Sequence, residues 1–453
     1  MQEFWRKWKY IVLMGFVAIA VFRLYLGYIF GGTMDQVCHL MLWDLISRHR
    51  NLYTDSYILV WPPFWWICLG LWSSLWNLLV DTVPMLAGPM GPSFFLKLLY
   101  YVFEILIALT LAKYIVMAES ANLQCKMNRE RFLKVACIYL LLPATWVITS
   151  LHGNFDSIPA FLVIFAFLLL EFESTETSAL FASALIGLAA MSRTFPAIFA
   201  FILLVYIFRK FRWTTGTFAC ALCIAPTFLS LYPLYLMNPD VVVRRLSYQG
   251  IPGGWWGLGG LARLLVSDQF TGKVIRFNYV VFYIAMLLLT VFLCREIWTG
   301  RSRILQAGLL MAVGLFCFAP SISNQNFYFL IPWAFWAAIV WKQKSAHVFL
   351  WFLCIDLALI YIALPTDLKN PTWFQWTYDF PQASLQQPIP SPAWLLKAIA
   401  WLTCILKRDG LDYNPFIQLL LRMPVWIALC IWFINMLKFK IYTSKSTSSP
   451  LEH

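Results

Sequence analysis

Charged residues are scarce in this sequence: they make up 12% of its 453 residues, whereas 61% are hydrophobic. Soluble domains contain about 25% charged residues, so the composition excludes an ordinary soluble enzyme with a single anchor. What remains is a series of apolar runs, each suited to a membrane-spanning helix. We therefore expect an all-α fold, built as a polytopic transmembrane helix bundle.

Repeated pairs of closely spaced cysteines are missing as well. The eleven cysteines fall mostly inside apolar segments, where a cysteine behaves as a small hydrophobic residue. This pattern gives no support for a disulfide framework or for a zinc site. The sequence predicts no metal site and no cofactor, and nothing in it supports a divalent metal.

Acidic residues are few: 21 stand against 34 basic residues, which gives a formal net charge of +13. The basic residues form short clusters at the ends of apolar segments, as the positive-inside rule describes for membrane proteins. We therefore expect the lipid bilayer as a partner and no nucleic acid.

A small-residue cleavage site is missing after the first apolar segment, so we expect the first helix to stay in the mature chain. Residues 1–9 are basic and indicate a cytoplasmic N-terminus. Residues 439–453 indicate a cytoplasmic tail, and its end, residues 451–453, looks like the scar of an expression tag.

Placing the basic clusters alternately in the cytoplasm predicts about twelve spans, with both termini cytoplasmic. The expected spans are residues 10–30, 94–117, 134–152, 157–172, 178–192, 194–208, 217–237, 277–296, 304–319, 326–341, 347–364 and 421–438. The chain would be a multi-pass integral membrane protein, of the plasma (inner) membrane if it is bacterial, with an extracytoplasmic active site.

Three outer regions complete this organisation. A transmembrane catalytic bundle over residues 10–364 carries outer loops at 31–93 and 237–276, and an extracytoplasmic loop at 365–420 precedes the last span. Residues 58–80 contain five tryptophans, which prefer the headgroup level, so we expect an interfacial or re-entrant helix hairpin there. Extracytoplasmic juxtamembrane helices would therefore accompany the bundle.

The most informative stretch is Ser150-Leu-His-Gly-Asn-Phe-Asp-Ser157, where three polar residues interrupt apolar sequence. An ionisable residue at such a position is a functional-site candidate by default, which points to His152, Asn154 and Asp156. Asp156 followed by Pro159 is also typical of a helix start, and both interpretations can hold together.

Asp35 follows the first span directly and begins an amphipathic run. If this run is helical, Asp35 and His39 lie one turn apart. A carboxylate in a partly desolvated setting can serve as a general base toward a hydroxyl, so Asp35 and Asp156 are the candidate catalytic residues. Capping of the helix is the alternative for Asp35.

A negatively charged leaving group would need cations on the same side, and arginine binds phosphate through paired hydrogen bonds. Arg193, at an expected outer helix end, is the most specific candidate. Arg244 and Arg245 are candidates too, although a solvated loop pair is the simpler interpretation. For Arg23 and Asp356, which lie within expected spans, we expect structural pairing.

Amide and aromatic side chains complete the candidate substrate-binding set. Gln249, Trp255 and Trp256 lie in a glycine-rich outer loop, and Gln325 and Tyr328 lie at another outer helix start. Such groups can bind sugar hydroxyls or stack on a sugar or an isoprenoid. Aromatic residues of an interfacial girdle are the alternative interpretation.

Together these features resemble the GT-C superfamily of polytopic glycosyltransferases, over about the first 340 residues. The later motifs are similar to those of bacterial and GPI-type mannosyltransferases. The resemblance is carried by Asp35, Ile46-Ser-Arg-His-Arg-Asn-Leu-Tyr53, Val60-Trp-Pro-Pro-Phe-Trp65, His152-Gly-Asn-Phe-Asp156, Arg193-Thr-Phe-Pro196 and Gln325-Asn-Phe-Tyr-Phe-Leu-Ile-Pro332.

The resemblance implies transfer of a sugar, mannose or another hexose, from a polyprenyl-phosphate donor to a lipid or glycan acceptor. Asp35 would be the general base of an inverting displacement, Asp156 would orient donor or acceptor, and Arg193 would meet the lipid phosphate. The sequence departs from the family pattern at Asn51, where glycine is usual, and at Arg193, where lysine is usual. It also lacks an Asp-x-Asp pair after the first helix.

Three other function classes stay open at this point: a transporter or flippase of lipid-linked sugars, a membrane acyltransferase with His152 as base, and a noncatalytic scaffold. A transporter is expected to show internal repeats and discontinuous helices, and neither is visible in the sequence.

Overall fold

The computed structural model describes most of the expected bundle. The described residues are 14, 17–18, 20–25, 39–40, 42–43, 45–46, 63–84, 91–123, 129–237, 239–240, 256, 268–320, 324–363, 407–408, 412–413 and 415–446.

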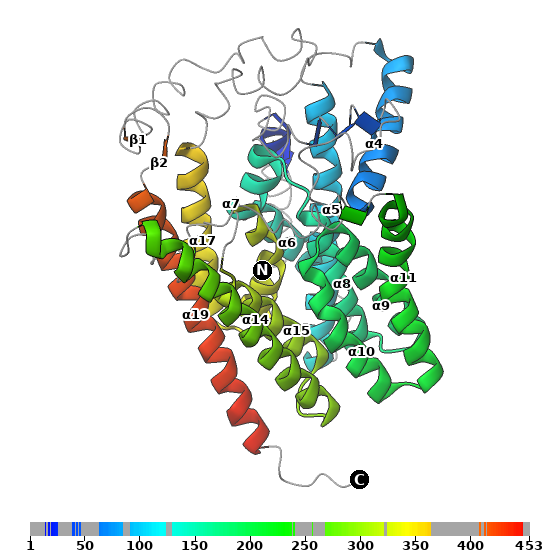
Figure 1. The fold of residues 1–453 in the computed structure, drawn as a ribbon, viewed down its shortest axis with the longest axis vertical. Helices are drawn as coiled ribbons and strands as arrows, with labels where there is room; N and C mark the ends of the chain where they lie inside the picture. The colour runs from blue at the N-terminus through cyan, green and yellow to red at the C-terminus, as the bar shows by residue number, and fades with distance from the viewer. Residues whose placement is uncertain are drawn as a thin grey trace, which may run out of the picture.

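The described fold is α-helical, as predicted (Figure 1). Its α-helices are α4 (Pro63–Thr82), α5 (Gly91–Leu123), α6 (Arg129–Leu141), α7 (Pro143–Trp146), α8 (Ser157–Phe172), α9 (Glu176–Ser192), α10 (Ile198–Lys210), α11 (Trp213–Met237), α14 (Asp268–Trp298), α15 (Ile304–Phe318), α16 (Ile331–Ile339), α17 (Lys344–Ala363) and α19 (Pro415–Ser446). A π-helix, η2 (Val147–His152), and two 3₁₀ turns, η3 (Phe195–Ala197) and η4 (Asn324–Phe329), join them. Strands β1 (Lys407–Arg408) and β2 (Asp412–Tyr413) form a minimal antiparallel pair.

Three described helices are long and apolar enough to cross a membrane, over Phe94–Ser120, Trp213–Tyr232 and Phe277–Trp298. A fourth span results if Arg129–Leu141 and Pro143–Ser150, which meet at a bend of 54°, cross together. The apolar helices over Ser157–Phe172, Glu176–Ser192, Ile304–Phe318 and Asn326–Ile339 have 17 residues or fewer, and at 1.5 Å per residue they fall short of a hydrocarbon core of about 30 Å. Twelve crossings therefore stay a prediction.

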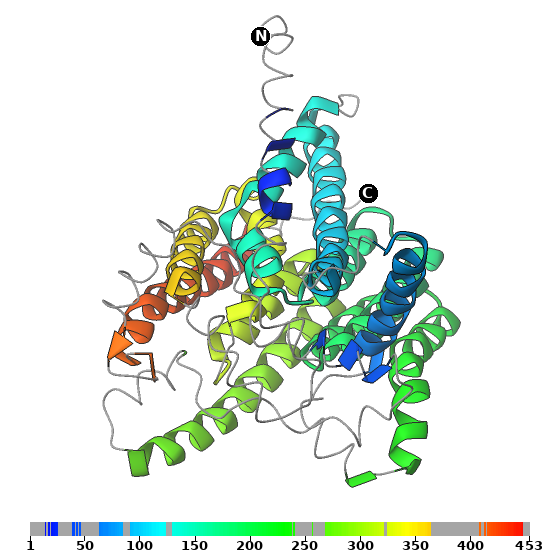
Figure 2. The ribbon, with the colours of Figure 1, turned by 90° about the horizontal axis from the view of Figure 1, so that it is seen from above.

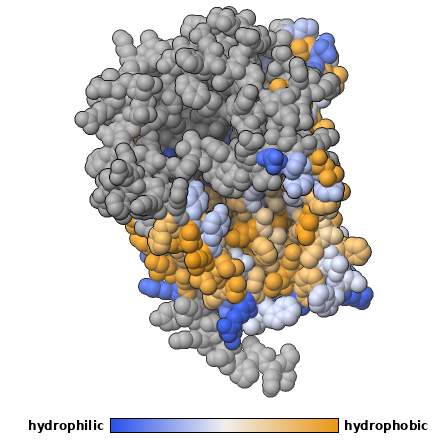
Figure 3. Space-filling view, viewed as in Figure 1, coloured by the Kyte–Doolittle hydropathy of each residue, from blue (hydrophilic) through white to orange (hydrophobic). Residues whose placement is uncertain are grey.

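Helix α8 lies at the centre and packs against α5, α9 and α15. Its sequence is apolar on every side, and 12 of its 16 residues are buried, as expected of a fully enclosed helix. Viewed from above, α17 and α19 lie together on one side of the bundle and α4 and α11 on the other (Figure 2). The described part of the face in Figure 3 is a broad apolar belt that ends in hydrophilic side chains at its lower border.

The expected span 134–152 is broken, because Pro143 has no N–H for the helix ladder. Leu142 before it is extended (φ −60°, ψ 122°), as a residue preceding proline prefers. The helix restarts as α7 and widens into η2, which ends at the polar cluster that the sequence singled out.

The hairpin expected within residues 58–80 is wrong for the described residues: α4 is one continuous helix of 20 residues. Its tryptophans do not all mark an interface, because Trp65 and Trp76 are buried in the protein. Trp72 donates a hydrogen bond to the carbonyl of Phe95 at 2.7 Å, which fastens α4 to the first turn of α5.

Candidate functional site

The polar cluster forms a tight turn between η2 and α8. Gly153 ends the π-helix with φ 71°, a left-handed conformation that favours glycine. Asn154 is fully buried, and its Oδ1 accepts a hydrogen bond from the Asp156 backbone N–H at 3.1 Å. π-Helical turns occur often at functional sites, and here one delivers a carboxylate to the interior.

Asp156 is paired with Arg193. The Arg193 Nε donates to Asp156 Oδ1 at 2.7 Å, and the two side chains are 17% and 1% exposed. Arg193 reaches the carboxylate because α9 ends there and its backbone becomes extended. Asp156 is the N-cap of α8, so the predicted helix start is confirmed; its side chain makes no capping hydrogen bond to the helix.

An aromatic stack lies beside this ion pair. The Phe155 ring is parallel to Trp65 at 4.2 Å between centroids, and the Arg193 Cζ lies 4.6 Å from the centroid of the same ring. Trp65 and Phe155 are both fully buried. The stack joins three segments, α4, the turn before α8 and the end of α9, that are far apart in the sequence.

His39 brings the segment after the first span to the same place. Its fully buried ring contacts Trp65 and Phe155 edge-on, at 4.9 and 5.3 Å between centroids. Its Nδ1 lies 2.9 Å from the Tyr100 hydroxyl. Ser157 donates to the Tyr100 carbonyl at 3.3 Å, which ties α8 to α5 at this point.

Lys97 adds a second buried cation that the sequence analysis missed. Its Nζ donates to the carbonyl of Ser150 in η2 at 2.8 Å, and the side chain is fully buried. A lysine near the start of the apolar run 94–117 was the signal that could have found it.

A separate polar cluster lies on the other side of η2. Arg23 Nη2 pairs with Glu104 Oε2 at 2.7 Å, and Thr149 of η2 donates to the same oxygen at 2.8 Å. The fully buried Tyr139 and Tyr328 lie close enough to interact electrostatically with Glu104. The pairing expected for Arg23 is confirmed, and Asp356 likewise lies near a cation, Arg422.

The remaining predicted residues fall in three groups. Trp256 is fully buried, packs on Phe327 at 4.8 Å and donates to the Phe316 carbonyl at 2.9 Å, so it anchors its segment to α15 and η4. Gln325 and Tyr328 belong to η4, which packs against η2 and α8. Of His152, the structure gives the backbone position at the end of η2.

Five predicted residues lie outside the described part of the chain: Asp35, Arg244, Arg245, Gln249 and Trp255. Their roles stay predictions. Among the residues that the structure describes, no group of three or more His, Cys, Asp or Glu side chains could hold a metal ion.

The described site therefore combines a buried carboxylate, a guanidinium group, a buried lysine and an aromatic wall. Arg193 Nη2 is buried and has no hydrogen-bond partner among the described residues, although the neighbouring Nε is engaged. A guanidinium in this state can bind an anionic oxygen without giving up its carboxylate partner. Such an arrangement can orient a phosphate next to a carboxylate.

Comparison with known proteins gives no match: no family model matches the sequence, and neither does any curated protein.

Proposed function

We propose that this protein is a membrane glycosyltransferase of the GT-C type. It would transfer mannose or another hexose from a polyprenyl-phosphate donor to a lipid or glycan acceptor, with inversion. The reaction would take place at the extracytoplasmic face of a multi-pass bundle of about twelve spans.

One observation supports the proposal: residues from three of the motifs behind the resemblance lie in contact with one another. Trp65, Phe155 and Arg193 each come from a different motif and form one stack. His39, four residues after Asp35, touches two members of that stack.

The proposal assigns a residue to each end of a displacement reaction. Asp35 would take the proton from the acceptor hydroxyl as the new glycosidic bond forms. The bond between the anomeric carbon and the phosphate oxygen would break, and Arg193 would stabilise the charge that develops on the lipid phosphate. Asp156 would hold the guanidinium in position, which supports an orienting role for this carboxylate.

The donor also suits a membrane site. A polyprenyl phosphate lies in the bilayer with its sugar at the interface, so packing of the isoprenoid can position the anomeric carbon. The aromatic wall of Trp65 and Phe155 would exclude water from the reacting groups. Substrate binding by Asn154, His152, Gln325 and Tyr328 belongs to the same proposal.

The test is sugar transfer by the purified protein. Polyprenyl-phosphate mannose, glucose, galactose and arabinose, each radiolabelled, are supplied with a membrane lipid extract as the source of acceptors. Label that moves from one donor to a new lipid or glycan supports the proposal. Label that stays on every donor in the presence of folded protein contradicts it.

A transporter or flippase of lipid-linked sugars is the second candidate, and the break at Pro143 favours it. Discontinuous helices line the binding sites of many transporters, and the 54° bend between Arg129–Leu141 and Pro143–Ser150 is of this kind. Proteoliposomes distinguish the two functions: movement of intact donor between leaflets, without transfer of its sugar, would favour the transporter.

A further inference from the structure

Two helix connections lie next to each other at the end of the bundle where α10 finishes. The first joins α10 to α11 and the second joins α14 to α15. Arg209 holds them together, because its Nη1 donates to the Ile297 carbonyl at 2.7 Å. Gly300, with φ +77°, faces the same guanidinium so closely that a Cβ there would lie 2.4 Å from Arg209 Nη2.

The two connections carry a cluster of exposed cations, which we call the basic patch. Its members are Arg209, Lys210, Arg212, Arg295, Arg301 and Arg303. One nearby carboxylate belongs to this surface: Glu171 Oε1 lies 3.8 Å from Arg303 Nη1, and Glu171 Oε2 accepts from the Leu305 N–H at 3.3 Å. Glu173 accepts from Lys113 at 2.9 Å. The basic patch therefore presents an excess of positive charge.

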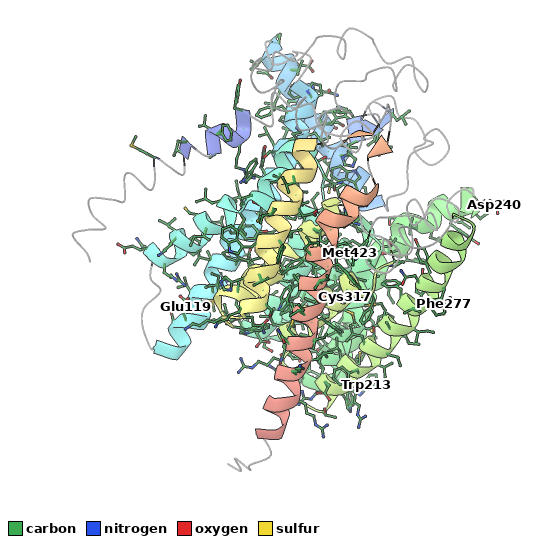
Figure 4. All side chains as sticks on the ribbon, turned by 90° about the vertical axis from the view of Figure 1, so that its left-hand side faces the viewer. Glu119, Trp213, Asp240, Phe277, Cys317 and Met423 are labelled. Carbon is green, nitrogen blue, oxygen red and sulfur yellow. The ribbon has the colours of Figure 1, made fainter. Side chains whose placement is uncertain are left out.

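Two tryptophans place the basic patch at the edge of the apolar belt. Trp213 is 75% exposed and Trp298 is 58% exposed, and both belong to the same two connections. Exposed tryptophans prefer the headgroup level of a bilayer. Helix α11 begins at Trp213, and its other end lies near Asp240 (Figure 4). Exposed apolar side chains, among them Phe218 and Val291, continue from there along α11 and α14.

We propose that the basic patch is a binding site for the headgroups of anionic phospholipids. A phosphodiester headgroup at this depth meets guanidinium groups that can form paired hydrogen bonds, while its acyl chains lie along α11 and α14. Arg209 organises the site because it is fixed to the neighbouring connection. This inference does not depend on the proposed glycosyl transfer.

The test compares lipid binding by variants that lose equal charge. Native mass spectrometry of the detergent-solubilised protein is used to titrate phosphatidylglycerol against phosphatidylcholine. Wild type is expected to retain phosphatidylglycerol preferentially, and Arg209→Gln/Arg212→Gln to bind it at least about tenfold more weakly. The control is Lys342→Gln/Lys344→Gln, which removes two other exposed cations. Equal losses in both double variants, or equal binding of the two lipids, would overturn the proposal.

A second variant tests the organising role of Arg209 without removing charge. Gly300→Val puts a branched side chain where the Arg209 guanidinium lies. We expect the affinity for phosphatidylglycerol to fall several-fold in this variant. The affinity of the control variant Lys342→Gln/Lys344→Gln should stay near that of wild type. Unchanged affinity in folded Gly300→Val would contradict a site built on Arg209.

Competition with inorganic polyphosphate distinguishes lipid from free polyanions. If polyphosphate displaces phosphatidylglycerol at equal phosphate concentration, the basic patch binds free polyanions and the proposal is overturned.

Discussion

Arg193 and Asp156 are 37 positions apart in the sequence, and the 2.7 Å hydrogen bond between Nε and Oδ1 joins them into one unit. Each residue shields the other from the cost of a lone buried charge. Removing one partner of such a pair typically costs about 3–5 kcal/mol, because the other charge is left uncompensated.

The ion pair predicts strong coupling in a double-mutant cycle. Asp156→Asn and Arg193→Gln are each expected to lower the free energy of unfolding by roughly 3 kcal/mol. The double variant should lose less than the sum, with a coupling energy of at least about 1.5 kcal/mol. Reversible unfolding in mixed micelles measures all three values. Additive losses would show that the pair does not act as a unit.

The aromatic stack predicts a graded response at Phe155. Phe155→Ala removes both the contact with Trp65 and the ring beneath Arg193, and we expect a loss of about 3–5 kcal/mol in unfolding free energy. Phe155→Tyr keeps the ring and should cost less than half as much if the hydroxyl finds a partner. The same unfolding assay checks both. Equal losses would contradict this prediction, because Phe155→Tyr keeps the ring that Phe155→Ala removes.

The Arg23 and Glu104 pair predicts a rescue. Glu104→Leu alone leaves a buried arginine without its carboxylate and should cost about 3–5 kcal/mol. Arg23→Met combined with Glu104→Leu replaces the pair with apolar groups and should return to within about 2 kcal/mol of wild type. Thermal denaturation in detergent follows the series. A double variant as unstable as the worse single variant would show that the pair has a role beyond mutual neutralisation.

Close packing of α9 against α11 predicts sensitivity at Gly187. A Cβ at this position would lie 2.6 Å from the Leu222 carbonyl oxygen and 2.9 Å from that of Cys223, so one backbone must move. We expect Gly187→Ala to cost about 1–3 kcal/mol, as overpacking does.

Gly70 offers the matched control, because among the described residues a Cβ there would meet the Ile46 side chain alone, at 3.4 Å. Gly70→Ala should be neutral or stabilising by up to about 1 kcal/mol, since alanine favours the helix. Denaturation midpoints of the two alanine variants give the comparison. Similar midpoints would contradict the close approach of α9 and α11.

The sequence predicted helix positions well where hydrophobicity and polar interruptions along a short segment define the helix. The expected span 157–172 coincides with α8, and the polar interruption at His152 to Asp156 is the turn before it. Pro143 was visible in the sequence, but the expected span ran through it, and the break that it causes was missed. The tryptophans of α4 were misleading because side-chain type does not tell which face of a helix is buried.

The tertiary contacts of the site were beyond the sequence pattern. Arg193 and Asp156 were both candidates, but no spacing rule connects residues on α9 and before α8. Lys97 and Glu104 were passed over inside a long apolar run, although a charged residue at such a position is itself a signal. The Ser150 carbonyl meets Lys97 through the packing of η2 against α5, and Arg23 meets Glu104 of α5 from the first apolar segment, so both contacts follow only from the tertiary structure.

The most direct test of the central claim is sugar transfer by Asp35→Asn, measured beside wild type with the donor that wild type accepts. Our account predicts that wild type moves label from the polyprenyl phosphate to an acceptor and that Asp35→Asn, with an unchanged melting temperature, retains less than about 1% of that rate, as expected when a general base is removed. Near wild-type transfer by the folded Asp35→Asn protein would contradict the account.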